Sequence, residues 1–231
     1  VCGSRNEKRP RATDAIADTA AGRRLQLIDT IGGRISPKSV GVSPGGLVFA
    51  QNMMYTHTVT AYDADGNLPA TIPHSVTLTD FGIDVPGTFK GAPVEAAFTP
   101  DGKEVYVSNY SMYGPGFSEG KDSCSPGDGT TKSFLYRIST ETWKIDQVIP
   151  VGAVPKYVAV TPDGSKVLVT NWCTWDLTIA DTATGARRAE GMRFDGAAFV
   201  GEWVAGCPGG LEGGEIRIEG LERTATDVLV R

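Results

Sequence analysis

The stretch PKYVAVTPDGSKVLVTN, residues 155–171, contains two short apolar runs separated by a sharp turn. Residues 158–160 form a run of the kind found in strands that are buried on both faces. Pro162 presets φ at the first turn position, and Gly164 takes the positive φ that follows. The next run, residues 166–170, alternates between apolar and polar side chains, as a half-buried strand does. The segment therefore predicts two antiparallel strands joined by a proline–aspartate–glycine (P-D-G) turn.

This pattern occurs three times in the chain. Each copy begins with a proline, has a second proline seven positions later, and ends its second apolar run with an asparagine. The copies are PKSVGVSPGGLVFAQN (residues 37–52), PVEAAFTPDGKEVYVSN (residues 93–109) and residues 155–171. An internal repeat of this kind is typical of folds built from one repeated supersecondary unit.

Further strands follow the repeated hairpins. After the third copy, residues 176–180 have the pattern of a third strand and residues 181–185 that of a turn. After the second copy, residues 145–151 have the pattern of a fourth strand that leads into the next repeat. Four antiparallel strands followed by a restart describe one blade of a β-propeller. We label these strands A to D in chain order; a β-sandwich with coincidental turns is the alternative.

The repeats have a recognisable character. The segments FTPDGKEVYVSNY (residues 98–110) and VTPDGSKVLVTNW (residues 160–172) resemble the YVTN family of β-propeller repeats, as in YncE-like and surface-layer proteins. The resemblance covers residues 24–185. It implies an all-β fold, an incomplete or partial ring of four-stranded antiparallel blades. It implies little about function, because this fold carries many roles.

The N-terminal segment does not share the repeat. Residues 1–23 are polar and charged without periodicity, and we interpret them as a tether. Cys2, followed by glycine and serine, resembles the mature start of a bacterial lipoprotein, which makes it a candidate for lipidation. Val1 is not the small residue that usually precedes a lipidated cysteine, and an unmodified terminus is the alternative.

The C-terminal segment, residues 186–231, also lacks the P-D-G signature. It contains strand-like stretches at residues 197–204, 215–218 and 226–230. We expect this segment not to form a blade that matches the three repeats. Either it closes an incomplete propeller, or the chain departs from its relatives after residue 186; the second interpretation is favoured.

Charge and cysteine content restrict the class of protein. The net charge of −5 leaves no basic surface of the type that binds nucleic acid. No apolar run approaches the length of a membrane-spanning helix. The four cysteines include no C-x-x-C pair and only two histidines are present, so a zinc site is not predicted. The cysteines are better explained as disulfide partners than as zinc ligands. Disulfides imply an oxidising compartment, so we expect a periplasmic, surface-associated or secreted protein.

We predict that one disulfide joins Cys124 to Cys173. Cys124 lies in the long B–C insertion of the second repeat, residues 110–131, and Cys173 at the start of the next B–C turn. Neighbouring blades place both on the same face, so the bond would hold the insertion over that face. Two free thiols on flexible loops are the alternative. Cys207 would then be unpaired, and Cys2 available for a lipid.

The same face is the candidate ligand surface. It carries the B–C loops and the D-to-A connections, including residues 74–91, whereas the A–B turns lie on the opposite face. The insertion is unusually apolar for a loop. The candidate residues are Asn109, Tyr110, Tyr113, Phe117, Asn171, Trp172 and Trp175. Alternatively, the aromatic side chains pack on the neighbouring blades and the asparagines bond turn backbone groups.

No residue pattern indicates catalysis. The chain lacks G-x-S-x-G, H-E-x-x-H and phosphate-loop motifs, and we expect His57 and His74 to be solvated. No cofactor is predicted. We therefore predict a binding or scaffolding module for a protein, a cell-wall component or a small molecule, rather than an enzyme. A propeller enzyme of lactonase or quinoprotein-like type and a structural component of a cell-surface layer are the alternatives.

Overall fold

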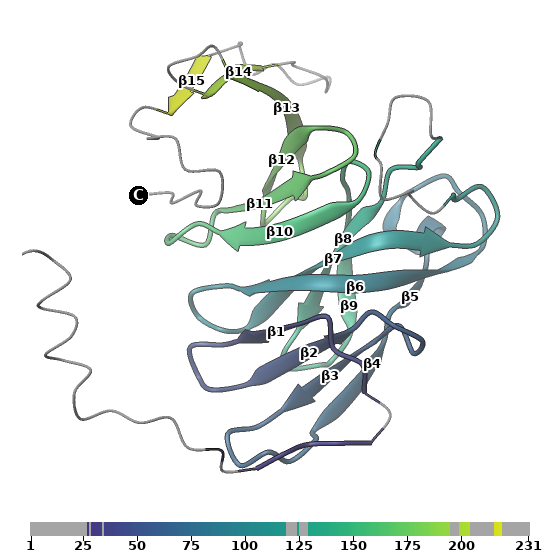
Figure 1. The fold of residues 1–231 in the computed structure, drawn as a ribbon, viewed down its shortest axis with the longest axis vertical. Coiled ribbons are helices and arrows are strands. Elements are labelled where there is room, and N and C mark those ends of the chain that lie inside the picture. Colours follow the sequence, from purple (N-terminus) through teal and green to yellow (C-terminus); the bar gives the residue numbers. More distant parts are fainter. Residues whose placement is uncertain are drawn as a thin grey trace, which may run out of the picture. The chain divides into compact units, whose positions relative to one another are not determined.

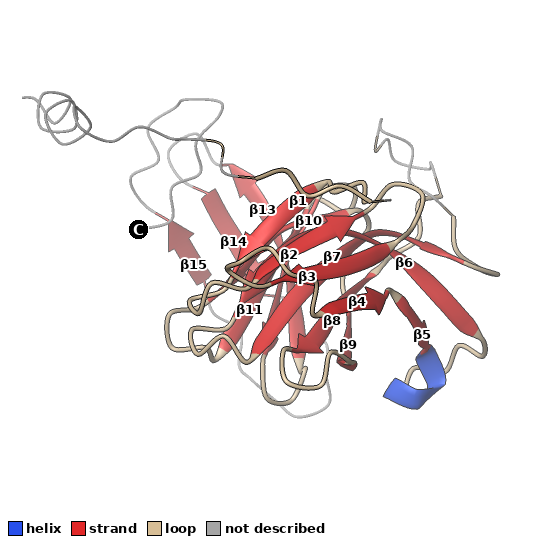
Figure 2. Cartoon of the chain, turned by 90° about the horizontal axis from the view of Figure 1, so that it is seen from below, coloured by secondary structure: helices blue, strands red, loops and turns tan. Residues whose placement is uncertain are grey.

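Antiparallel strands make up nearly all the regular structure of the described residues, apart from one 3-10 turn, drawn in blue (Figure 2). The computed structural model describes residues 27, 29–33, 35–118, 124, 129–194, 199–203 and 215–218, with side chains up to residue 187. The chain separates into two compact units, residues 1–33 and 34–231, and all described strands belong to the second. The predicted tether and Cys2 lie outside the described residues.

The first repeat forms a four-stranded antiparallel sheet (Figure 1). Its strands, in spatial and chain order, are β1 (Ser39–Val42), β2 (Val48–Asn52), β3 (Thr58–Tyr62) and β4 (Ala70–Pro73). β1 and β2 are the A and B strands of the first copy, so the predicted hairpin is confirmed.

The second repeat forms a five-stranded sheet, because an extra strand pairs with its A strand. The strands, in spatial order, are β5 (Ser75–Thr77), β6 (Thr88–Phe98), β7 (Glu104–Tyr113), β8 (Phe134–Ser139) and β9 (Ile145–Pro150), and the 3-10 turn η1 (Leu78–Phe81) follows β5. β6 and β7 pair beyond the repeat, up to Lys90 opposite Tyr113. Tyr110 and Tyr113 therefore lie in a strand, and the prediction of a loop at these positions is wrong. Lys90 belongs to the D-to-A connection, which has no repeat signature.

The third repeat begins a six-stranded sheet. Its strands, in spatial order, are β10 (Pro155–Val160), β11 (Lys166–Asn171), β12 (Asp176–Asp181), β13 (Arg187–Phe194), β14 (Phe199–Trp203) and β15 (Glu215–Ile218). β13 is the D strand and lies beyond residue 185, while β14 and β15 continue the same sheet. Cys207 and residues 226–230 lie outside the described residues.

Apolar side chains hold the sheets together face to face. β6 contacts β1 and β2 of the first sheet and β10 of the third. Side chains alternate along β7, so Val105 and Val107 join the cluster shared with the first sheet, whereas Tyr106 joins the cluster shared with the third. Phe49 and Phe98 meet edge to face at 5.0 Å between the first two sheets. The middle sheet is thus covered on both sides, as a blade is within a β-propeller.

The A–B turns of neighbouring blades stack at one end of the sheets. Gly102 and Gly164 both have positive φ, 71° and 73°, as the P-D-G motif predicts. Gly102 lies against Pro44 of the preceding repeat, and Gly164 lies against Pro100 in the same way. The C–D turn joins this end, since Thr182 Oγ1 donates to the Gly164 carbonyl at 2.7 Å. The B–C turns and D-to-A connections are left at the opposite end.

A glycine at that opposite end gives a stability test. A Cβ atom on Gly91 would overlap the side-chain amide of Asn109. The amide is held in place because its Oδ1 bonds His74 Nδ1 at 2.8 Å and its Nδ2 donates to the Phe134 carbonyl at 3.0 Å. We expect Gly91→Ala to lower the free energy of unfolding by about 1–3 kcal/mol, measured by urea denaturation.

The matched control is Gly45→Ala. The atom nearest to a Cβ on Gly45 is Ser43 Oγ at 3.8 Å, an ordinary contact distance. If both glycine variants unfold at the same urea concentration, Asn109 is not held as described.

Candidate functional site

The turns opposite the P-D-G end meet on one face of the blades. The B–C turn of the first sheet reaches the second sheet through His57, whose ring centroid lies 4.6 Å from that of Tyr113. The B–C insertion of the second sheet is linked to the B–C turn of the third through Cys124 and Cys173. We call the surface formed by these connections the B–C face. It comprises Tyr55, His57, Tyr110, Tyr113, Trp172 and Trp175, together with Lys156 of β10.

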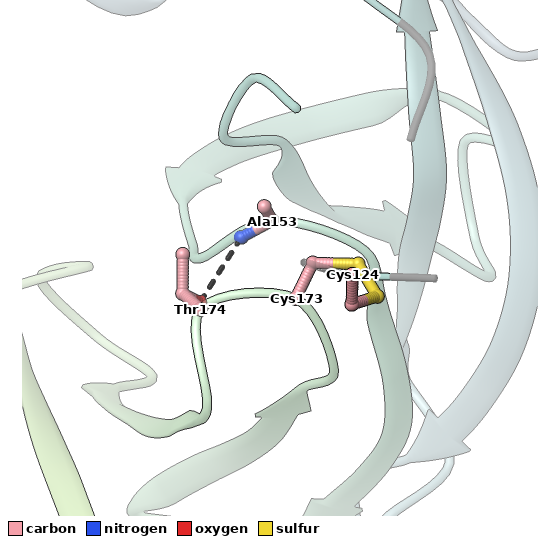
Figure 3. The surroundings of a disulfide bond; sticks show 4 residues. All are labelled: Cys124, Ala153, Cys173 and Thr174. Atoms are coloured by element: carbon pink, nitrogen blue, oxygen red, sulfur yellow. Dashed lines mark hydrogen bonds between the residues drawn. A yellow bond between two sulfur atoms is a disulfide. The ribbon is translucent and has the colours of Figure 1, made fainter. Parts of the chain in front are cut away.

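The structure joins Cys124 and Cys173 in a disulfide (Figure 3). Their Cα atoms are 4.7 Å apart and 49 residues apart in sequence. The Cys173 turn is anchored to the connection between β9 and β10: Cys173 N–H donates to the Ala153 carbonyl at 3.0 Å, and Ala153 N–H to Thr174 Oγ1 at 3.2 Å. The disulfide therefore ties the insertion to a turn that is itself fixed by hydrogen bonds.

The closing asparagines lie inside the fold rather than on its exposed surface. Asn171 is buried, and its Nδ2 donates to Asp176 Oδ1 at 2.6 Å and Thr178 Oγ1 at 2.8 Å. Asn52 does the same in the first sheet, where its Nδ2 donates to Thr60 Oγ1 at 3.1 Å. These amides bridge strand B to strand C behind the turn. Asn171 is therefore a structural residue and not part of an exposed ligand surface.

Asn109 has a different partner because its B–C turn is replaced by the insertion. Its Nδ2 donates to the Phe134 carbonyl, so its Oδ1 accepts from the protonated Nδ1 of His74. Both side chains are fully buried. His74 is therefore not solvated, and the expectation that it would be is wrong. Burial lowers the pKa of His74 to about 3, because the charged imidazolium loses its hydration there.

Phe117 packs back on the second sheet. Its ring centroid lies 5.1 Å from Phe89 and 6.1 Å from Phe134, both edge to face. Phe89 and Phe134 belong to an apolar cluster that also includes Val76 and Leu78 of the D-to-A connection. Phe117 thus covers this cluster and is not presented to a ligand, as the alternative interpretation expected.

Tyr110 and Trp172 hold a cation between them. The Nζ atom of Lys156 lies 4.4 Å from the ring centroid of Tyr110 and 5.0 Å from that of Trp172. Both distances fit cation–π attraction. Lys156 was not predicted from the sequence. Its position one residue after the repeat proline, two residues before a buried valine, was the available signal that it lies beside the B–C turn.

Trp175 occupies a backbone conformation that usually belongs to glycine. Its φ is +57°, and its N–H donates to the carbonyl of Asn171, four residues earlier, at 3.1 Å. The C–D turns contain the same arrangement, with Gly185 (φ +71°) and Trp143 (φ +58°) at the equivalent position. Trp143 packs against Phe49 of the first sheet, with ring centroids 6.2 Å apart. Trp175, by contrast, is 69% exposed.

Charged side chains meet at the other end of the blades. Arg137 bonds Asp146 at 2.7 Å and Glu104 at 3.4 Å, and its Nη1 donates to the Thr182 carbonyl beside the P-D-G turn. Within the described ranges, no three His, Cys, Asp or Glu side chains are grouped so as to hold a metal ion. In the same ranges, no helix has the length and apolarity needed to cross a membrane.

No protein-family profile matches the chain, and no curated protein matches it. Several solved structures are similar. A candidate 6-phosphogluconolactonase from Bacteroides fragilis is 19% identical, with a TM-score of 0.42, over 70% of this chain and 39% of that chain. The dihydro-heme d1 dehydrogenase NirN in complex with DHE is 20% identical, with a TM-score of 0.46, over 87% of this chain and 39% of that chain. Kuenenia stuttgartiensis hydrazine synthase is 19% identical, with a TM-score of 0.29, over 78% of this chain and 59% of that chain.

The chain thus spans less than two thirds of each of these three structures. Membership of the YVTN family stays a prediction.

The buried His74 predicts a pH dependence of stability. Above the ordinary histidine pKa of 6.5, the folded and unfolded chains are both neutral at this residue. As the pH falls from 6.5 towards 3, the unfolded chain binds a proton that the folded chain does not. The free energy of unfolding should therefore fall by about 1.4 kcal/mol per pH unit through His74 alone. We expect His74→Asn to be less stable at neutral pH but to lose stability less steeply between pH 6 and 4. If urea denaturation shows that the free energy of unfolding falls equally steeply with pH in the parent protein and in His74→Asn, this assignment is contradicted.

The disulfide predicts a redox dependence of stability. Replacing Cys124 and Cys173 together by serine should lower the free energy of unfolding by up to about 4 kcal/mol, since the bond restricts the unfolded chain. Dithiothreitol should lower the melting temperature of the parent protein and leave that of the double variant unchanged. Non-reducing peptide mapping should recover the two cysteines in one cross-linked pair; separate alkylation of each without reduction would show that they are free.

Proposed function

We propose that the protein is an extracytoplasmic binding module and that the B–C face is its contact surface. The observation that carries this proposal is Trp175, which is 69% exposed although its backbone is left-handed. A bulky residue in this region costs on the order of 1 kcal/mol or more, and such strain is concentrated at functional sites. Packing on Phe49 accounts for the same strain at Trp143. Packing within the chain covers little of Trp175, so contact with a ligand is the better explanation.

Other exposed aromatic side chains lie on the same face. Trp172 is 44% exposed and Tyr55 is 87% exposed. Tyr55 also has a positive φ, 68°, in the B–C turn of the first sheet. Tryptophan and tyrosine are the side chains most often found as anchors at binding surfaces, and exposed apolar patches of this kind mark interaction sites. The face therefore has the composition of a contact surface.

The disulfide supports both parts of the proposal. It lies within the B–C face and ties Cys124 to the turn that carries Trp172, which restricts the backbone of that turn before a ligand arrives. A structural disulfide is also compatible with an oxidising compartment and so with export.

The test is co-sedimentation of the purified protein with insoluble cell-envelope material from cells that express it. Replacing Trp172 and Trp175 together by alanine should weaken binding about thirtyfold, as expected for the loss of one strong anchor. The disulfide and the melting temperature should be retained, because both side chains are exposed on a turn.

Leu68→Ala is the matched control. Leu68 is an exposed apolar residue in a C–D turn, at the end opposite to the B–C face. Its removal should leave co-sedimentation unchanged. Equal binding by the parent protein and the double tryptophan variant would reject the B–C face as the contact surface.

A further inference from the structure

We infer that a second copy of this chain packs its first sheet on the third sheet of the first copy, and that two copies close one ring of six blades. The contact joins two surfaces. We call them the outer face of the first sheet, defined by Val40 and Val42, and the outer face of the third sheet, defined by Ala159, Leu168 and Thr170. This inference does not depend on the proposed function. It depends on the repeat, because each face carries the positions that pack blade against blade elsewhere in the chain.

The outer face of the first sheet points away from the second sheet. Gly41 lies between the two valines of β1, and a Cβ atom on it would lie 3.3 Å from Cβ of Ala96 in the second sheet. Because side chains alternate along a strand, Val40 and Val42 point to the other side. They are 63% and 62% exposed. Two adjacent positions of one strand thus present apolar side chains to solvent.

The same positions are used for packing in the other two repeats. Counting from the proline that begins each copy, Val42 corresponds to Phe98 and Val160. Phe98 packs on the preceding blade, edge to face with Phe49 at 5.0 Å. Val160 packs against the apolar cluster shared by the second and third sheets. The fold therefore uses this position to join a blade to the one before it, and among the described blades the first has none before it.

The outer face of the third sheet carries the complementary positions. Counting back from the closing asparagine, Leu168 corresponds to Phe49 and Tyr106, which each pack on the following blade and are fully buried. Leu168 pairs with Ala159 and alternates with Val167, which packs on the second sheet. Leu168 and Ala159 therefore face the other way, and both are only half-buried. This face has the composition that accepts the valine positions of a next blade.

A hydrogen bond between neighbouring blades recurs at matching positions. Ser108 Oγ of the second sheet donates to the carbonyl of Lys156 in the third at 2.8 Å. A serine of β1 donates to the same repeat position of the second sheet, the carbonyl of Val94. Thr170 corresponds to Ser108 and is exposed, while Lys38 corresponds to Lys156. In the assembly, Thr170 of one copy therefore donates to the carbonyl of Lys38 in the second copy, which sets the register between them.

The number of blades favours a closed dimer. Since one chain carries both faces, the contact is head to tail, and such contacts produce either a closed ring or an open filament. β-Propellers typically close with about four to eight blades. The three described sheets of one chain are too few for such a ring, whereas two copies of three sheets each give six. Both outer faces of each copy are buried in this ring.

The test is the molar mass of the purified full chain, measured by light scattering after gel filtration over a range of concentrations. We expect the parent protein to be a dimer. Val42→Asp should raise the dissociation constant about a hundredfold or more, because both interfaces of the ring then bury an unpaired carboxylate. Thr170→Arg should act in the same way from the other face. Mixing the two variants should restore dimers, because one of the two interfaces is then unaltered.

Leu68→Asp is the matched control. Leu68 is 53% exposed but lies in a C–D turn of the first sheet and not on its outer face, so this variant should keep the mass of the parent protein. A parent protein that is monomeric at every concentration would overturn the inference, and so would a trimer or a larger assembly. A dimer that survives both Val42→Asp and Thr170→Arg would place the contact elsewhere and overturn it too. If the mixed variants stay monomeric, the contact is not head to tail and the inference fails.

Discussion

Burial of the middle sheet between its two neighbours is the constraint on which the rest of the structure depends. Strand β7 shows it most directly, because successive side chains pack on different sheets: Val105 and Val107 on the first, Tyr106 on the third. With both faces apolar, the middle blade has little room for polar chemistry between its neighbours. Where charge does occur, as in the Arg137 pairs with Asp146 and Glu104, it lies near the turns. This ion-pair network therefore lies towards an end of the blades rather than between them.

The turns at the two ends of the blades are held in different ways. At one end, each P-D-G turn lies against the proline of the preceding repeat, as Gly164 does against Pro100, and the C–D turn bonds to it. Insertions there would break the stacking. At the other end, a buried asparagine such as Asn171 joins strands B and C behind the turn, so the turn itself is free to vary. The disulfide and the exposed side chains of Tyr55, Trp172 and Trp175 lie at this variable end.

The predictions from sequence were right where the determinants are local. Proline, glycine and alternation within one repeat were enough to find the A–B hairpins, and neighbouring blades were enough to suggest the pairing of Cys124 with Cys173. They failed where the partner is distant and carries no pattern. Asn109 pairs with His74, 35 residues away, and Tyr113 pairs with Lys90, so neither burial nor strand could be deduced from the repeat. Lys156 was missed for the same reason, since only the folded chain places it between two rings.

Trp143 and Trp175 show what the sequence of a turn can and cannot determine. Both follow a four-residue turn, both donate their N–H to the carbonyl four residues earlier, and both have φ close to +58°. Nothing in the turn itself distinguishes them. The difference comes from the neighbouring sheet: Phe49 of the first blade covers Trp143, whereas Trp175 remains largely exposed. A strained tryptophan that is covered can be explained by the stability of the fold. An exposed one is not explained in this way, and this asymmetry between two equivalent turns is the physical reason for the proposal that the B–C face binds a ligand.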